Sequence, residues 1–280
     1  MNAFLENHSN EEHVPEFSVS DHFISDFKNR NYLSSRTVHP KRRTDLNQER
    51  NQQWETTIHN LLTNFPRDHI LNCDETSWQV FPNRLKTWAQ KGSQNVQIHV
   101  NGNGKESITA LATVAADGTK CPLYLIAQGD SDKCEKSQLG DTAHHFTNQS
   151  HKGWSTSETF QDYSHKISDH FHNEPLHLLL DFHSSYHGDE VKEVAESLDI
   201  DLHYIPACQT GIYQPLDRNY FGSVKATGRK QFRKRFRDNN PNFKFSKKDA
   251  VQDLIYSWEH LSVDTILDAW DIYDFGEIEF

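Results

Sequence analysis

The stretch from residue 176 to residue 206 constrains the fold most, because it reads strand, helix, strand in close succession. "LHLLLD" is an apolar run of the buried-strand type that ends on Asp181. "GDEVKEVAESLDI" follows with apolar residues at helical spacing, and "DLHYIP" reads as another strand. A helix between two such strands predicts a parallel βαβ unit with a right-handed crossover. Sites in parallel sheets gather at the carboxyl ends of strands, which makes Asp181 a candidate site residue.

Other segments predict further strands and helices of an α/β protein. "HILNCDETSW" predicts a short strand that ends at the acids beginning with Asp74, and "KTWAQKG" predicts a second. "ESITALATVAADGTKCPLYLIAQG" reads as two strands joined by a hairpin, whereas residues 130–150 read as a polar loop. Helices are expected in "SDHFISDFKNRN", "NQERNQQWETTIHNLLTN" and "STSETFQDYSHKISDHF". Residues 1–18 are polar and predict a frayed tail.

Charge is sorted along the chain. The total is 29 basic against 40 acidic residues, a net charge of −11. Residues 218–248 nevertheless hold eleven Lys or Arg against one acid, and residues 28–43 are also basic. Positive patches on an acidic protein are typical of local polyanion binding. The candidate DNA-binding residues are Arg218, Lys225, Arg229, Lys230 and Arg233, with Lys41, Arg42 and Arg43 in the early patch. A solvated helix face is the alternative for residues 218–237.

Cysteine usage and hydropathy limit the compartment. Four cysteines in 280 residues, with no CxxC pair, favour a reducing compartment such as the cytosol or nucleus. No signal-peptide segment and no run of about 18 apolar residues occurs, so neither secretion nor a membrane partner is expected.

Three aspartates share a pattern that suggests metal chemistry. Asp74 and Asp181 each close an apolar run, and Asp217 follows the last strand, 36 residues after Asp181. Converging carboxylates repel one another unless cations bridge them, and clusters of oxygen ligands suit Mg²⁺ or Mn²⁺. Two such ions about 4 Å apart can support phosphodiester chemistry. Alternatively, Asp217 caps the next helix, Asp181 forms an Asx turn and Asp74 is a turn residue.

The motifs around these acids resemble those of a known family. "ILNCDETSW", "LLLDFHSSYH" and "IPACQTGIYQPLDRNYFGSVKA" look like the acid-bearing motifs of DDE superfamily endonucleases of the pogo and mariner type. The resemblance implies an RNase H-like mixed sheet flanked by helices, with a short helical N-terminal remnant and a helical C-terminal segment. It implies that Asp74, Asp181 and Asp217 hold two Mg²⁺ or Mn²⁺ ions. Glu75, His183, Thr210 and Gln214 are expected around these ligands, with Thr210 and Gln214 shaping the loop before Asp217.

The resemblance also implies an organisation and partners. The expected segments are a tail at 1–18, a remnant of a helix-turn-helix region with a linker helix at 19–66, the endonuclease at 67–237 and an acidic helical segment at 238–280. A helix-turn-helix module is represented only by its last part, so the chain is expected to be truncated at its N-terminus. The expected partners are DNA, as transposon ends and target, and a second copy in a homodimer. The expected location is the nucleus. Phe182 and Ala207 depart from the family pattern beside two of the acids.

Several other side chains invite a functional interpretation that a structural role explains better. His183 and His187 stand four apart as in zinc sites, but they lack a third ligand at a suitable spacing. The tryptophans at positions 78, 88 and 154 can stack on bases, although tryptophans near strands are more often core. Cys73 reads as a buried apolar residue.

Two main functional hypotheses and one weaker option follow. The first is a metal-dependent DDE transposase catalytic domain that cuts and joins DNA strands, which the intact acid trio favours. The second is a domesticated or decayed DNA-binding protein that keeps the fold without turnover, which the shortened N-terminus favours. An unrelated metal phosphatase is a third, weaker option.

Overall fold

The computed structural model describes residues 20–31, 48–81, 106–218, 220–239 and 245–273. The chain divides into two compact units, residues 1–42 and 43–280. The first unit contributes the predicted helix α1 (Asp21–Arg30), which Ser20 caps by accepting the N–H of Phe23. The predicted strand "KTWAQKG", Trp88 and the early basic residues Lys41, Arg42 and Arg43 lie outside the described residues.

The second unit is built on a mixed six-stranded sheet of order β4-β3-β2-β1-β5-β6. Its strands are β1 (Ile70–Gln79), β2 (Ser107–Ala115), β3 (Tyr124–Gln128), β4 (Phe146–Ser150), β5 (Leu176–Leu180) and β6 (Ile200–Tyr204). The strands β1, β2 and β3 pair antiparallel, whereas β4 with β3, β5 with β1 and β6 with β5 pair parallel. The hairpin and the βαβ unit predicted from sequence are therefore confirmed, with α5 (Asp189–Ser197) as the crossover helix.

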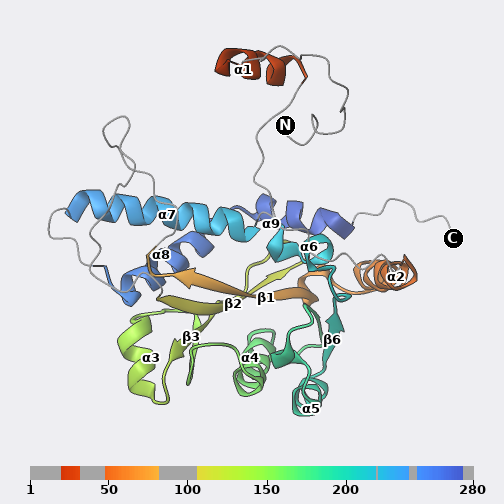
Figure 1. Ribbon diagram of the computed structural model, residues 1–280. Helices are drawn as coiled ribbons and strands as arrows, with labels where there is room; N and C mark the ends of the chain where they lie inside the picture. Colours follow the sequence, from red (N-terminus) through yellow and green to blue (C-terminus); the bar gives the residue numbers. More distant parts are fainter. Residues whose placement is uncertain (1–19, 32–47, 82–105, 219, 240–244, 274–280) are drawn as a thin grey trace, which may run out of the picture. The chain divides into compact units, whose positions relative to one another are not determined.

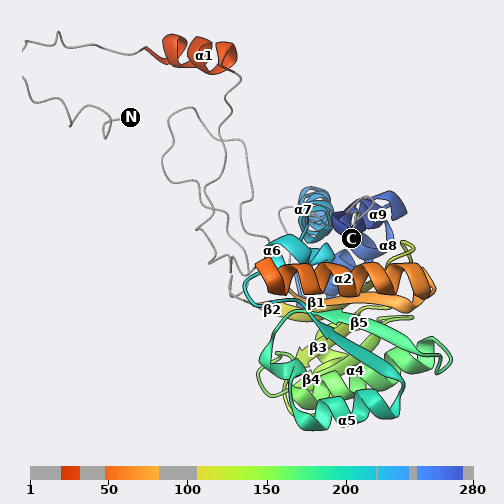
Figure 2. The same ribbon diagram turned by 90° about the vertical axis from the view of Figure 1, so that its right-hand side faces the viewer.

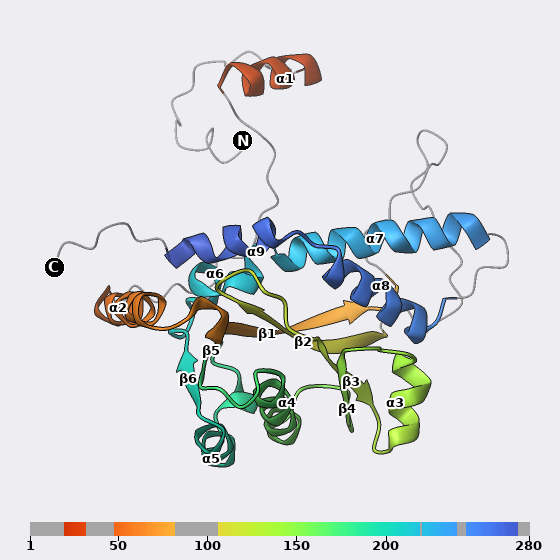
Figure 3. The same cartoon turned by 180° about the vertical axis from the view of Figure 1, so that it is seen from behind.

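Helices cover both faces of the sheet (Figures 1 and 3). The face with α4 (Ser157–His170) and α5 forms one apolar cluster, and the opposite face forms a larger one with α2 (Gln48–Asn64), α7 (Tyr220–Asn239), α8 (Lys247–Glu259) and α9 (Val263–Trp270). Figure 2 shows α2 on the same side of the sheet as α7 and α8. Short elements complete the unit: η2 (Arg67–His69), η3 (Ser184–Tyr186), α6 (Thr210–Tyr213), η4 (Pro215–Asp217) and η5 (Asp271–Tyr273).

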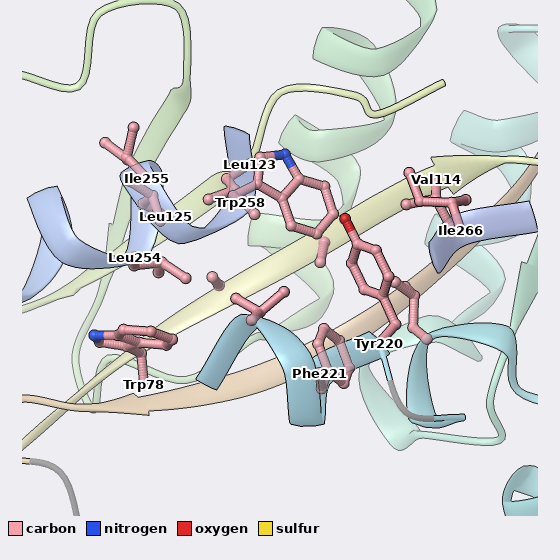
Figure 4. Packing of buried hydrophobic residues seen from close by; sticks show 14 of the residues in the cluster. Trp78, Val114, Leu123, Leu125, Tyr220, Phe221, Leu254, Ile255, Trp258 and Ile266 are labelled. Atoms are coloured by element: carbon pink, nitrogen blue, oxygen red, sulfur yellow. The ribbon is translucent and has the colours of Figure 1, made fainter. Parts of the chain in front are cut away.

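Strand β1 is buried on both faces over its first five residues, and the alternation of side chains assigns each residue to a face. Ile70 and Trp78 belong to the larger cluster, whereas Leu71 and Cys73 belong to the other. The indole of Trp78 packs against α8 and α7 (Figure 4). A Cβ on Gly228 of α7 would overlap that indole, so this glycine allows the close approach of helix and strand. The basic helix thereby sits directly against the central strand.

The prediction of a polar loop over residues 130–150 is wrong. This segment contains α3 (Asp132–Leu139), which ends at Gly140 with a φ of 74°, and the strand β4. The sequence signal is weak because every residue of β4 is half-buried, without an apolar and polar alternation. The strand forms because it pairs in parallel with β3, which the local pattern does not reveal.

The predicted linker helix α2 and the C-terminal helices belong to the same compact unit as the sheet. The contact-based division falls after Arg42, and the expected boundaries at residues 66 and 237, which the resemblance implied, stay a prediction. Within the described ranges, no helix combines the length and apolarity needed to cross a bilayer.

Candidate active site

The parallel register of β1 and β5 places two of the three acids side by side. Asn72 lies opposite Leu179, so continuing the register by two residues brings Asp74 opposite Asp181. Leu179 belongs to the cluster on the face that carries α7, and residues two apart in a strand share a face. Both carboxylates therefore project towards the α7 side of the sheet.

Asp181 directly follows β5 as predicted, but the prediction that Asp74 ends its strand is wrong. Asp74 is the fifth residue of a ten-residue strand. The reason is that β1 has two partners of unequal length. Its pairing with β5 stops at Asn72, whereas its antiparallel pairing with β2 continues to Gln79. The site therefore lies where the parallel pair ends, not where the strand ends.

A buried amide network brings Asp217 to this place. The Asn72 side chain donates from Nδ2 to the Leu179 carbonyl at 3.1 Å and to Gln214 Oε1 at 2.9 Å. Its Oδ1 accepts the N–H of Leu216 at 3.2 Å, and Gln214 Nε2 donates to the Cys73 carbonyl at 3.2 Å. These bonds fasten η4 to β1 and so hold the acid at its end near the other two.

Gln214 was expected from sequence to shape this loop, but Asn72 was missed. It is fully buried in an apolar run. A buried amide inside a strand needs hydrogen-bond partners, which is the signal that could have identified it.

The three carboxylates act on one another electrostatically. Burial raises the pKa of Asp74 well above its ordinary value, and the charges of Asp217 and Asp181 raise it further. Burial also raises the pKa of Asp181, while His183 opposes that rise. Asp74 is 8% exposed, Asp181 is half-buried and Asp217 is exposed, so the acids form a gradient from the core to solvent.

The acid cluster fits a divalent cation by its donor chemistry. Asp181 Oδ1 and Glu75 Oε2 are buried, and neither has a hydrogen-bond partner among the described residues. Oxygen donors with unsatisfied negative charge are the ligands of Mg²⁺ and Mn²⁺. The three acids do not form a group whose ligand atoms all lie within 4.8 Å of one another. In the described part of the chain, such a group is formed by His177, Asp201 and His203.

Lys225 of the basic helix faces the acids. Burial lowers its pKa, whereas the charges of Asp217 and Asp74 raise it. Further along α7, Arg229 is half-buried and Lys230 and Arg233 are exposed. The basic patch predicted from sequence therefore extends along α7 from the acid cluster towards solvent.

The remaining predicted residues take less central positions. Glu75 is half-buried, and burial raises the pKa of its carboxyl, while the charge of His183 opposes that rise and the charge of Asp181 adds to it. The exposed His183 lies with Nδ1 2.7 Å from Ser185 Oγ. Thr210 is half-buried at the start of α6.

Most of the other side chains that invited a functional interpretation have a structural role. His187 stacks on Tyr204, with ring centroids 4.3 Å apart. Trp78 is a core residue, and burial raises the pKa of the Cys73 thiol to about 12, which excludes a reactive thiolate at neutral pH. Trp154 is 66% exposed.

Comparison with known proteins connects this geometry to a family. Tigger transposable element-derived protein 4 of Mus musculus is 23% identical over 263 residues, which cover 91% of this chain and 49% of that protein. The Homo sapiens protein "Pogo transposable element with KRAB domain" is 28% identical over 168 residues, which cover 58% of this chain and 26% of that protein. The chain thus spans about half of the first relative and about a quarter of the second.

The likeness to a solved structure and the family match are consistent with each other. The crystal structure of the Mos1 Strand Transfer Complex matches with a TM-score of 0.54 at 14% identity, over 91% of this chain and 68% of that one. This likeness shows the RNase H-like fold that the motifs implied. The family model described as "DDE superfamily endonuclease" matches residues 105–270, a range that contains Asp181 and Asp217 but begins after Asp74. With more than half of its length matched by that model, the chain belongs to the DDE superfamily endonucleases.

Proposed function

We propose that this chain is a transposase catalytic domain that cuts and joins DNA strands with divalent metal ions. The observation that carries the proposal is the register of Asp74 with Asp181, together with the amide network that holds Asp217 beside them. Two Mg²⁺ or Mn²⁺ ions held by these carboxylates would supply activation of the attacking hydroxyl and stabilisation of the leaving oxygen.

The chain's own residues prepare the site for a nucleic-acid strand. Asp74 and Asp181 are supported by the rigid sheet, and the exposed Asp217 leaves one side of the cluster open to solvent. Strong mutual repulsion among the acids makes cation binding favourable. Lys225 supplies a positive charge next to the acids, where the phosphate of the scissile strand would lie.

The basic side chains of α7 would hold the DNA beyond that point. Arg218, Lys230 and Arg233 are exposed and can contact phosphates, with Arg229 beside them. We include Lys41, Arg42 and Arg43 as a second contact region on sequence grounds. Transposon ends and target DNA as partners, a homodimeric assembly and a nuclear location belong to the same proposal.

Strand nicking of supercoiled plasmid tests the catalytic proposal. We expect nicking in the presence of Mg²⁺ or Mn²⁺, and a loss of at least about a hundredfold in Asp181→Asn, because the amide cannot replace a charged ligand. Asp169→Asn, which changes an exposed aspartate on α4, is the matched control and should nick like the parent. Equal nicking by the parent and Asp181→Asn would refute the role of the three carboxylates.

A second candidate function is DNA binding without turnover. Both curated relatives carry names of transposable-element origin, and one is called a "derived protein", which favours keeping this alternative. Retained DNA binding with no nicking under either metal would support it.

Salt dependence tests the DNA-binding residues separately from catalysis. Each phosphate contact contributes about −0.9 to the slope of log K against log salt for duplex DNA. Replacing Arg229, Lys230 and Arg233 with Gln should therefore make that slope shallower by about 2 to 3. An unchanged slope would assign these side chains to a solvated helix face.

A further inference from the structure

A second cluster of ligand-type side chains lies on the β5–β6 edge of the sheet. Parallel pairing sets His177 opposite Asp201 and Leu179 opposite His203. Paired residues and residues two apart share a face, so His177, Asp201 and His203 all project on the face that carries α2. On that face the ring of Phe65 packs edge-on against His177, with ring centroids 4.1 Å apart. The cluster uses none of the residues of the acid site.

The separations match the ligand shell of a small cation. His177 Nδ1 lies 3.2 Å from His203 Nε2 and 3.4 Å from Asp201 Oδ2. The three ligand atoms all lie within 4.8 Å of one another. Bonds of about 2.0–2.2 Å to Zn²⁺ at tetrahedral angles place neighbouring ligand atoms about 3.3 Å apart.

Hydrogen bonding alone accounts poorly for this arrangement. The single Nδ1 of His177 faces both an imidazole nitrogen and a carboxylate oxygen. A ring nitrogen carries either one proton or one lone pair, so it cannot form a well-aligned bond to each neighbour at once. A cation between them would let all three atoms act as electron-pair donors.

We propose that His177, Asp201 and His203 form a binding site for a transition-metal ion of the Zn²⁺ type. Two imidazoles and one carboxylate suit Zn²⁺ and disfavour Mg²⁺, which prefers oxygen ligands alone. The Asp201 side chain is 74% exposed, so a water molecule can take the fourth position.

Such an ion would fasten the edge strand β6 to β5. His177 lies on β5, four residues before Asp181, which directly follows that strand, so the clip would stabilise the strand that leads into one acid of the candidate active site. The proposal does not depend on catalysis, because its ligands and its test are separate from the acid cluster.

Co²⁺ binding to the full chain is the direct test. The measurement is made in excess Mg²⁺, which would fill the proposed carboxylate site, and tetrahedral Co²⁺ is followed by its visible absorption with Zn²⁺ as competitor. We expect one site per chain with nitrogen and oxygen ligands, without the thiolate charge-transfer band that cysteine ligation would give. Zn²⁺ should also raise the thermal midpoint, because it binds the folded state.

Asp201→Asn and His203→Gln should each weaken Co²⁺ binding by at least tenfold, since loss of a supporting partner alone costs about 10- to 100-fold. Because the Asp201 side chain is exposed, Asp201→Asn should leave the folded structure intact. His151→Gln is the matched control, because exposed His151 pairs with Asp130 at 3.0 Å and belongs to no three-ligand group formed by the described residues. Absent binding, or equal binding in the parent and Asp201→Asn, would overturn the proposal.

Discussion

Asn72→Ala should destabilise the protein far more than the loss of one amide suggests. The substitution leaves the Leu216 N–H and Gln214 Oε1 without the partner they have in the structure, and both residues are fully buried. A buried polar group left unsatisfied costs about 1–3 kcal/mol, so two such groups cost about 2–6 kcal/mol. That is a large part of the about 5–15 kcal/mol that stabilises a typical domain.

Urea unfolding followed by circular dichroism measures this loss. The midpoint should fall while the m-value stays constant, because the surface exposed on unfolding changes little. Asn64→Ala is the control, since the exposed Asn64 side chain bonds only the carbonyl of Asn60 within its own helix. That variant should change the free energy of unfolding by no more than about 0.5 kcal/mol.

A double-mutant cycle with Gln214→Ala distinguishes the network from general packing. Residues in one hydrogen-bond network show coupling of about 0.5–3 kcal/mol, so the two losses should not add. A loss below about 1 kcal/mol for Asn72→Ala, or strict additivity in the cycle, would refute the view that the amides hold η4 to β1.

Three further substitutions, one of them with a matched control, test the packing and charges around the sheet. Gly228→Ala should lose about 1–3 kcal/mol in urea unfolding through overlap with the indole packed against it, whereas Gly222→Ala, with open space at its Cβ, should gain up to about 1 kcal/mol. Lys120→Met should lose about 2–3 kcal/mol, because Lys120 Nζ donates to three carbonyls at the end of α8; an unchanged midpoint would contradict this. Burial raises the pKa of Asp253 to about 6, even though Arg235 lies beside it. The protonated carboxyl therefore favours folding below pH 4. That contribution to the free energy of unfolding, up to about 3 kcal/mol, is lost as pH rises through 6. Asp253→Asn should flatten the stability profile between pH 4 and 6, and a parent profile already flat there would contradict the raised pKa.

Much of the fold could be predicted from local patterns. The apolar run that ends on Asp181, the amphipathic α5 and the next run were sufficient for the βαβ unit, because strand and helix periods are local properties. The segment with α3 and β4 escaped prediction because β4 depends on its pairing with β3.

The acids of the candidate site could be singled out from the sequence, but their geometry could not. Residue type and spacing were enough to single out Asp74, Asp181 and Asp217. They could not show that Asp74 lies mid-strand, since that follows from the unequal pairing of β1 with β5 and β2.

By itself, the sequence determined the periodic elements, the sorted charge and the three acids, all of which depend on near neighbours in the chain. The tertiary structure alone decided which distant side chains meet. Asn72 and Gln214 are 142 residues apart, and His177 reaches Asp201 and His203 only across a strand pair. The physical reason is that such contacts depend on strand register, which is set by the packing of the whole sheet and its helices rather than by any local pattern.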